Sequence, residues 1–139
     1  MIRILIVDRN QIIRSSLRQI ITAQCNGRVI IEANDTEQMF DILSKQDINF
    51  ILFDIDIAKS NALDVLKKIK NLYPAMSILI LSIHQEIQYV TSSIKTGANG
   101  YLLKTNIANE ADIAVKKLIE GERYISPYFN EKLNNINNI

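Results

Sequence analysis

The chain has 139 residues, 47% of them hydrophobic, and its 16 basic and 15 acidic side chains give a formal net charge of +1. A domain of this size can bury a core without metal or disulfide crosslinks. The near-neutral charge excludes long-range attraction to nucleic acid or to an anionic membrane, so we expect neither as a partner of this chain. The single cysteine, Cys25, excludes an internal disulfide, and no apolar run approaches the ~20 residues of a membrane span. We therefore predict a cytoplasmic protein.

Apolar runs alternate with helical spacings of apolar residues along the chain. The runs are rich in Ile, Leu, Val and Phe, as buried strands are, and the spacings of three and four residues between them are typical of amphipathic helices. Asn and Gly residues stand where several of the helices should begin or end. The predicted strands are 2–7, 28–33, 50–53, 77–81 and 101–103, and the helical apolar positions that follow them fall within 13–21, 39–43, 62–73, 87–94 and 111–119.

Successive strand-then-helix units predict a parallel sheet with helices on both faces, because right-handed crossovers leave few other arrangements. No repeat or low-complexity block interrupts residues 1–125, which we assign to one domain. Residues 126–139 read as a linker or tail in which Phe129, Leu133 and Ile136 could line a short helix.

Polar residues follow four of the five predicted strands. The run at 50–53, F-I-L-F, leads directly into Asp54, and the other strands lead into Asp8, Ser82 and Lys104. Each residue alone has an ordinary structural explanation, as a helix cap or a surface charge. The carboxyl ends of parallel strands meet at one edge of a sheet, however, so these four side chains should converge in one cleft.

The expected cleft has the composition of a phosphoryl-transfer site. An aspartate can accept a phosphoryl group as an acyl phosphate, and a lysine and a hydroxyl can hold the transferred oxygens. A second acid can help to bind Mg²⁺.

Several segments resemble the receiver domains of response regulators in two-component signalling, over roughly residues 2–128. The resemblance implies a flavodoxin-like (βα)5 fold, a doubly wound parallel sheet with strand order 2-1-3-4-5. The segment G-A-N-G-Y-L-L-K, together with E-G-E-R-Y-I-S-P, is similar to the NarL/LuxR branch in particular. The segments are I-L-I-V-D at 4–8, F-D-I at 53–55, L-S-I-H at 81–84, G-A-N-G-Y-L-L-K at 97–104 and E-G-E-R-Y-I-S-P at 120–127.

The resemblance assigns a role to each polar residue of the cleft. Asp54 matches the phosphoacceptor and Lys104 the phosphate-binding lysine. Ser82 matches the switch hydroxyl that moves toward the phosphoryl group, and Tyr101 the aromatic switch residue that turns inward when this hydroxyl moves.

The resemblance also implies Mg²⁺ as a cofactor, with Asp8, Asp54 and the backbone carbonyl of Asp56 as its ligands. The family has a second acid after the first strand, and this chain has Arg9 in its place. A guanidinium is permanently cationic, so we expect a weak or absent metal site.

Two hypotheses for Arg9 remain open. In the first, Arg9 contacts Asp54 or Asp56, replaces the charge of the metal, and makes the chain a degenerate receiver with little dependence on phosphorylation. In the second, Arg9 points to solvent and Asp8 and Asp54 still bind Mg²⁺ weakly. Nearby, His84 could pair with Asp56, although a solvated loop histidine is the simpler expectation.

The partner implied by the resemblance is a histidine kinase or phosphotransfer protein that donates the phosphoryl group. The response would be altered packing on the face of the fourth helix, fifth strand and fifth helix, through which a homodimer could form. We expect no enzyme beyond self-catalysed phosphoryl transfer and dephosphorylation. The alternative is a stand-alone protein-interaction module that works without phosphorylation.

Regulation of transcription would require a DNA-binding domain beyond this chain. The eleven residues after Tyr128 are too few for a helix-turn-helix unit, and they contain one Lys and no Arg. They therefore provide no surface that could grip nucleic acid phosphates.

Overall fold

The apolar runs of the sequence form one parallel sheet in the structure, a computed structural model that describes residues 1–23 and 27–137. The strands are β1 (Ile2–Val7), β2 (Arg28–Ala33), β3 (Phe50–Asp54), β4 (Ser77–Ser82), β5 (Gly100–Leu103) and β6 (Tyr124–Ile125). They lie in the order β2-β1-β3-β4-β5-β6, and every neighbouring pair is parallel. The predicted flavodoxin-like fold with strand order 2-1-3-4-5 is confirmed, and a sixth strand extends it.

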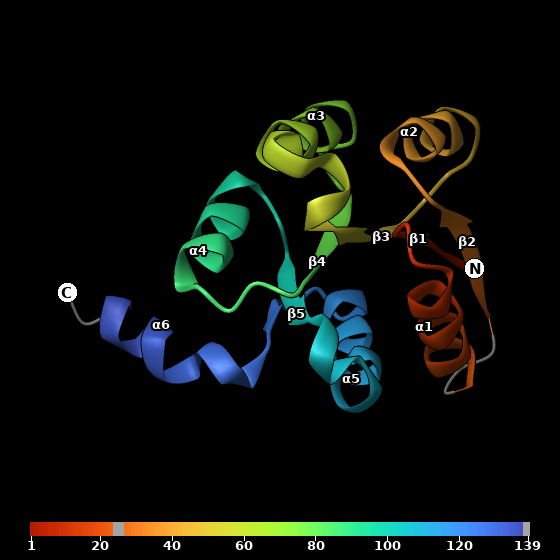
Figure 1. The fold of residues 1–139 in the computed structure, drawn as a ribbon. Coiled ribbons are helices and arrows are strands. Elements are labelled where there is room, and N and C mark those ends of the chain that lie inside the picture. The colour runs from red at the N-terminus through yellow and green to blue at the C-terminus, as the bar shows by residue number, and fades with distance from the viewer. Residues whose placement is uncertain (24–26, 138–139) are drawn as a thin grey trace.

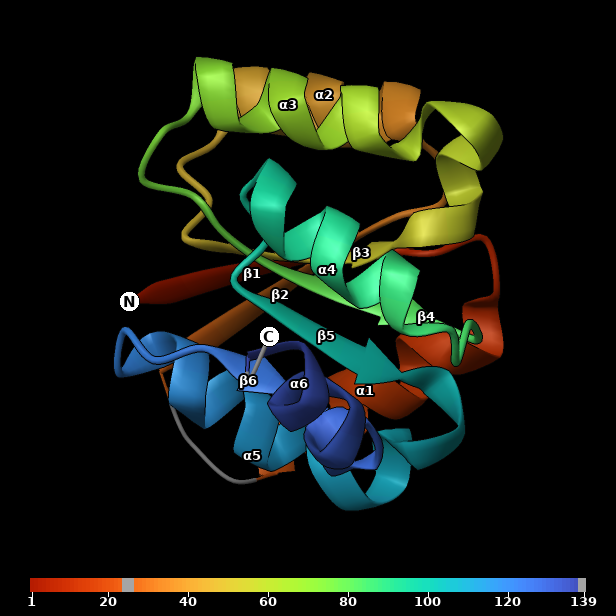
Figure 2. The ribbon, with the colours of Figure 1, turned by 90° about the vertical axis from the view of Figure 1, so that its left-hand side faces the viewer.

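Helices cover both faces of the sheet (Figure 1). They are α1 (Gln11–Ala23), α2 (Thr36–Lys45), α3 (Ala62–Leu72), α4 (Ile87–Thr96), α5 (Ile107–Ile119) and α6 (Asn130–Asn137). Helices α2, α3 and α4 lie on one side of the sheet and α1 and α5 on the other (Figures 1 and 2). Cys25 and the predicted helix end at Asn26 lie outside the described residues. None of the described helices combines the length and the apolar character that crossing a membrane requires.

The core consists of two apolar layers separated by the sheet. Successive strand residues point to opposite faces, so a row of neighbours in register enters one layer together. Val7, Phe53, Ile80 and Tyr101 form such a row, and each of them is fully buried on the side of α2, α3 and α4. The other layer joins β1, β3, β4 and β5 to α1 and α5. Burial on both faces explains why the central strands are apolar without alternation.

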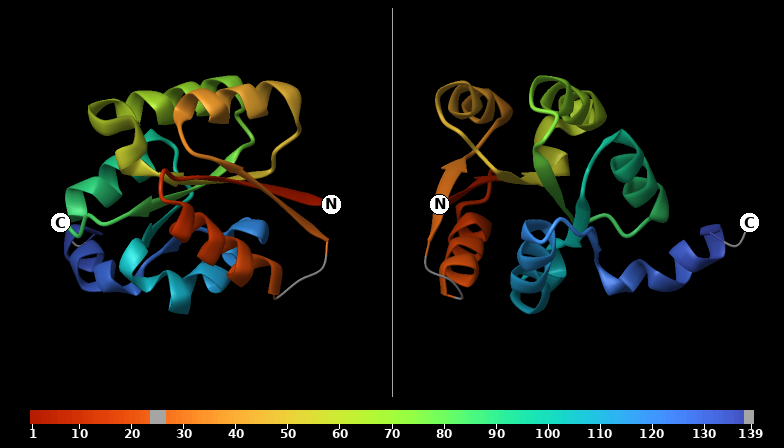
Figure 3. Two further views of the ribbon diagram at one scale, coloured as in Figure 1. Left: turned by 45° about the vertical axis from the view of Figure 1, so that its right-hand side comes forward. Right: turned by 180° about the vertical axis from the view of Figure 1, so that it is seen from behind.

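The sixth strand was not predicted, because two residues are too short to show a periodic pattern. It pairs with β5 through Gly100↔Tyr124 and Tyr101↔Ile125. The chain then passes through a short 3-10 helix (Pro127–Phe129) into α6, which continues beyond this edge of the sheet (Figures 1 and 3). The edge strand of the predicted sheet is therefore covered by the C-terminal segment.

A test of this edge is the substitution Gly100→Ala. A Cβ atom at this position would lie 2.5 Å from the Tyr124 carbonyl oxygen and 2.8 Å from Leu79 Cδ1. We expect the free energy of unfolding to fall by about 1–3 kcal/mol, the usual cost of overpacking. Denaturant unfolding of both proteins measures it.

The control for this substitution is Gly121→Asn. Gly121 has φ +81°, and a Cβ there would meet nothing within 4 Å. Asn tolerates this left-handed conformation, so the control should lose less stability than Gly100→Ala. Equal losses would contradict close packing of β6 on β5.

Candidate functional site

The strand register brings the predicted polar side chains to one edge of the sheet. Val7 pairs with Phe53, so Asp8, which follows β1, and Asp54, the last residue of β3, lie at the same level. Ser82 pairs with Leu103, the residue before Lys104. The site is therefore built from the carboxyl ends of β1, β3, β4 and β5, the position at which parallel α/β sheets bind ligands.

Lys104 joins the two acids. Its Nζ atom lies 2.8 Å from Asp8 Oδ2 and 3.1 Å from Asp54 Oδ2. All three side chains are largely buried, with Asp8 2% and Asp54 9% exposed. Three residues that are far apart in the sequence thus form one buried cluster of charges.

The second oxygen of each acid shapes the loop that follows it. Asp8 Oδ1 accepts a hydrogen bond of 2.8 Å from the Asn10 amide, and Asp54 Oδ1 accepts one of 3.0 Å from the Asp56 amide. Each carboxylate therefore uses one oxygen for a turn and directs the other at Lys104.

Burial sets the proton affinities in the cluster. It raises the pKa of the Asp54 carboxyl above the ordinary 3.8, and the Asp56 amide and the Lys104 ammonium offset this increase only in part. For Lys104, burial lowers the pKa, but the carboxylates of Asp8 and Asp54 outweigh it and leave the pKa above 10.5. The ammonium thus stays charged, while ionised Asp54 carries a net energetic cost in the folded protein.

The two acids fit Mg²⁺ with a reduced set of ligands. Asp8 Oδ2 is buried and has no hydrogen-bond partner of good geometry among the described residues, although the Lys104 ammonium is close. Mg²⁺ is held in proteins by one or two carboxylates and several waters. Asp8 and Asp54 could supply the two carboxylates. No group of three or more His, Cys, Asp or Glu side chains suited to a metal occurs in the part of the chain that the structure describes.

Arg9 is exposed and forms no hydrogen bond or ion pair with a described residue. The contact of the first hypothesis, from Arg9 to Asp54 or Asp56, is thus not formed in the described part of the chain. The outward direction agrees with the second hypothesis. The positive charge beside the two acids comes from Lys104.

Another arginine, which the sequence analysis missed, supports the backbone of the site. Arg14 donates hydrogen bonds to the carbonyl of Asp8 and, at 2.9 Å, to Glu32 Oε1. Arg18 also binds Glu32, at 2.7 Å. Burial raises the pKa of Glu32, but the hydrogen bonds from Arg18 and Arg14 outweigh this and lower it overall. The spacing of four residues predicts that both arginines lie on one face of α1. No pattern in the neighbouring sequence indicates that this face contacts Glu32 of β2.

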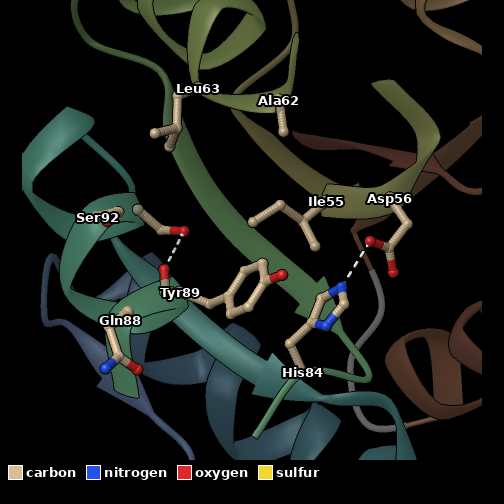
Figure 4. Close-up of a pocket in the computed structure, with 9 residues that line it drawn as sticks. Ile55, Asp56, Ala62, Leu63, His84, Gln88, Tyr89 and Ser92 are labelled. Carbon is tan, nitrogen blue, oxygen red and sulfur yellow. Dashed lines mark hydrogen bonds and ion pairs between the residues drawn. The ribbon is translucent and has the colours of Figure 1, made fainter. Parts of the chain in front are cut away.

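His84 connects the predicted switch residues. Its amide donates to Ser82 Oγ (2.9 Å), and its carbonyl accepts from the Tyr101 hydroxyl (3.0 Å). Its ring lies 2.7 Å from Asp56 Oδ1 through Nε2 and stacks on Tyr89 at a centroid distance of 4.0 Å. The simpler expectation of a solvated loop histidine was therefore wrong, because Asp56 and Tyr89 hold the ring in place (Figure 4).

A cavity of about 480 Å³ lies next to this histidine, between the loop after β3 and helix α4. Figure 4 shows the stacked rings of His84 and Tyr89 on its wall. Its lining residues are Ile55, Asp56, Ala62, Leu63, His84, Gln88, Tyr89, Ser92 and Ser93.

A flavodoxin-like sheet with two acids and a lysine at its carboxyl edge is the arrangement expected for a receiver domain. The model of one family, described as "Response regulator receiver domain", matches residues 4–116. The chain belongs to this family.

Known proteins place the chain in the NarL/LuxR branch. It is 35% identical over 126 residues to the transcriptional regulatory protein DegU of Brevibacillus brevis, an alignment that covers 91% of this chain and 53% of DegU. It is 28% identical over 123 residues to the nitrate/nitrite response regulator protein NarL of Escherichia coli, covering 88% and 57%. The chain thus spans little more than half the length of these relatives.

Solved structures share the fold. A LuxR-family two-component response regulator from Aurantimonas sp. SI85-9A1 superposes with a TM-score of 0.87 at 22% identity, covering 99% of this chain and 98% of the other. The isolated REC domain of RcsB from Salmonella enterica serovar Typhimurium superposes with a TM-score of 0.85 at 18% identity, covering 96% and 99%. These structures therefore share the receiver fold with the chain.

The raised pKa of Asp54 predicts that Asp54→Asn stabilises the protein at neutral pH. Because the pKa in the folded state lies above the ordinary 3.8, the wild type loses stability as the pH rises through that folded pKa, and the neutral amide does not. The gain should disappear as the pH falls below 3.8, where the carboxyl is protonated in both states.

Urea unfolding between pH 3 and pH 8 in the presence of a chelator measures this difference. The matched control is Asp47→Asn, which changes the same charge on the exposed residue after α2. A loss of stability at pH 7 in Asp54→Asn would contradict the net cost of ionising Asp54.

Proposed function

We propose that Asp54 accepts a phosphoryl group in a two-component relay. Its Oδ1 is held by the Asp56 amide, so Oδ2 is the oxygen left to attack phosphorus. The bond from phosphorus to the donor's leaving group breaks as the acyl phosphate forms, and the leaving group keeps the bonding electrons. The observation that supports this most directly is the 3.1 Å contact of Lys104 Nζ with Asp54 Oδ2.

The neighbouring side chains have supporting roles in this proposal. Lys104 stabilises the charge of the transferred oxygens, and Ser82 and Tyr101 respond to them as the switch pair. Tyr101 is fully buried, and burial raises the pKa of its hydroxyl to about 12, so it remains a neutral donor to the His84 carbonyl.

Receiver domains bind Mg²⁺ at the phosphorylation site. In this chain we assign the ion to Asp8, Asp54 and the backbone carbonyl of Asp56. Mg²⁺ would neutralise charge on the phosphoryl oxygens when bound. With Arg9 in place of the second acid, binding should be weak, and Lys104 supplies part of the positive charge itself.

The donor in this proposal is a histidine kinase or a phosphotransfer protein, the classes with which response regulators interact. Receiver domains are generally not classical enzymes, and we assign this chain only self-catalysed phosphoryl transfer and dephosphorylation. We place the receiver in residues 1–125 and a linker or tail in 126–139, within a cytoplasmic protein. If a DNA-binding domain follows in the full protein, phosphorylation would regulate transcription.

Dimerisation is the proposed output. A solved structure shows two dimers of RcsB, whose receiver domain shares this fold, bound to DNA. For this chain we propose a homodimer through α4, β5 and α5, because Tyr101 and Lys104 lie on or beside β5 and connect that face to the site.

The phosphoacceptor is tested by incubation with a small acyl phosphate donor, with and without Mg²⁺, followed by intact-mass measurement. We expect a gain of one phosphoryl group that depends on Mg²⁺ and is absent from Asp54→Ala. The control Asp56→Ala removes the neighbouring acid and should still be modified. An unmodified wild type would instead leave the alternative, an interaction module that works without phosphorylation.

Arg9→Asp tests the metal site. A second acid next to Asp8 restores a ligand and removes a positive charge, so Mg²⁺ affinity should rise by about tenfold or more, ~1.4 kcal/mol. Calorimetric titration measures it.

The matched control is Arg123→Asp, which makes the same charge change on an exposed residue. Arg123 precedes Tyr124, which pairs with Gly100 at the opposite end of β5 from Lys104. It should leave the affinity nearly unchanged, because surface charges at long range are screened. Equal gains in the two variants would show that Arg9 does not act locally.

A further inference from the structure

The C-terminal segment packs directly on the predicted switch residue. Phe129 is fully buried, and its ring meets that of Tyr101 edge-on, with a centroid distance of 5.5 Å and an interplanar angle of 89°. This is a favoured geometry for aromatic pairs. Tyr101 has no exposed surface, and Phe129 forms part of its cover.

Hydrogen bonds tie the same segment to the backbone of β5 at Tyr101 and at Leu103. The Ser126 amide donates to the Tyr101 carbonyl (2.9 Å), and the Leu103 amide donates to Ser126 Oγ (3.0 Å). Ser126 is fully buried, so its hydroxyl satisfies a backbone donor that water cannot reach. Leu103 is the residue immediately before Lys104, so the segment is attached close to the charged cluster.

Two further contacts lie next to the segment and within it. The Tyr124 hydroxyl donates to Glu110 Oε1 of α5 at 2.7 Å. The Phe129 amide donates to the Ser126 carbonyl at 3.0 Å, which closes the turn that begins at Pro127. We call residues 126–129 the strap.

The strap is linked to the phosphoacceptor by successive contacts. Tyr101 donates to the His84 carbonyl, and the His84 ring binds Asp56. The Asp56 amide in turn donates to Asp54 Oδ1. An outward rotation of Tyr101 would break its bond to His84 and also require Phe129 to move.

We propose that the strap is a positioning element that holds Tyr101 buried before a phosphoryl group reaches Asp54, so that docking of the strap and phosphorylation favour the same conformation. By linkage, whatever docks the strap more firmly also favours phosphorylation, and phosphorylation docks the strap. The direction of this coupling rests on the proposed function of Asp54. The proposal that the strap holds Tyr101 buried does not rest on that function.

The strap also connects the site to the chain beyond it. Phe129 is followed directly by α6, and Leu133 of α6 packs on the same core layer as Phe129. A change at Tyr101 that displaced Phe129 would therefore move the start of α6. This chain's own C-terminal segment thus lies on Tyr101 and covers part of the β5 surface.

The test uses the whole chain labelled with 3-fluorotyrosine and observed by fluorine NMR. The Tyr101 resonance is assigned with Tyr101→Phe. In the wild type we expect one buried Tyr101 resonance, and a phosphodonor with Mg²⁺ should not add an exposed one. In Phe129→Ala a solvent-exposed Tyr101 resonance should appear, its population raised about tenfold or more by loss of the aromatic contact and of the buried ring.

Variants at neighbouring positions separate positioning from general destabilisation. Phe129→Leu keeps an apolar side chain over Tyr101 and should restore most of the buried resonance. Tyr128→Ala removes the adjacent, half-exposed ring and should leave Tyr101 buried. Ser126→Ala retains the core and should speed hydrogen exchange of the Leu103 amide about tenfold, because that amide loses its acceptor. It also tests the strap if Phe129→Ala does not fold.

The outcomes distinguish the strap from the phosphoacceptor. If Tyr101 stays buried in Phe129→Ala, or, where that variant does not fold, if the Leu103 amide exchanges no faster in Ser126→Ala than in the wild type, the strap is overturned. If Tyr101 becomes exposed and a phosphodonor returns it to the buried state, the strap and its coupling are supported. If it stays exposed although the intact mass shows the phosphoryl adduct, the coupling is overturned. If Tyr101 becomes exposed in Phe129→Ala but no adduct forms, the strap is supported and the proposed role of Asp54 fails.

Discussion

The ammonium of Lys104 lies between two buried carboxylates, and the rest of the site depends on this arrangement. Removing charges from water is costly, so each member of the cluster would destabilise the fold without its partners. Asp8 and Lys104 follow β1 and β5, and Asp54 is the last residue of β3, so their contact requires parallel register across β4 as well. The apolar layers on the two faces stabilise that register, at roughly 1.5–3 kcal/mol for each fully buried Leu, Ile, Val or Phe side chain. The apolar core thus stabilises a fold that contains a buried cluster of charges, although burying those charges is itself unfavourable.

The same acids build the loops around the chemistry. Asp8 and Asp54 each accept a hydrogen bond from a backbone amide of the turn that follows. These two acids therefore position the loops after β1 and β3. Arg14 adds a second constraint by binding the Asp8 carbonyl and Glu32 of β2. The carboxylate oxygens that face Lys104 are therefore held in place before any substrate arrives, which lowers the reorganisation that phosphoryl transfer would require.

Much of this arrangement could be predicted from the sequence, for a simple reason. Strands buried on both faces need unbroken apolar runs, and an acid such as Asp54 directly after one stands out. Contacts set by loop conformation could not be predicted in the same way. The outward direction of Arg9 and the pairing of His84 with Asp56 depend on torsion angles that no pattern encodes. Strand β6 was missed because tertiary pairing with β5, and not local periodicity, creates it.

His84 is the point at which the site and the switch meet. Its amide, carbonyl and ring bind three different partners, Ser82, Tyr101 and Asp56, so the β4–α4 loop cannot move without altering all three contacts. A contiguous network transmits a signal only if some element in it has two stable arrangements. Backbone hydrogen bonds within the sheet have only one stable arrangement. The Tyr101 ring, with a buried position that a separate segment covers, is the part of this network to which we assign two arrangements, and our proposal therefore includes the C-terminal segment in the switch.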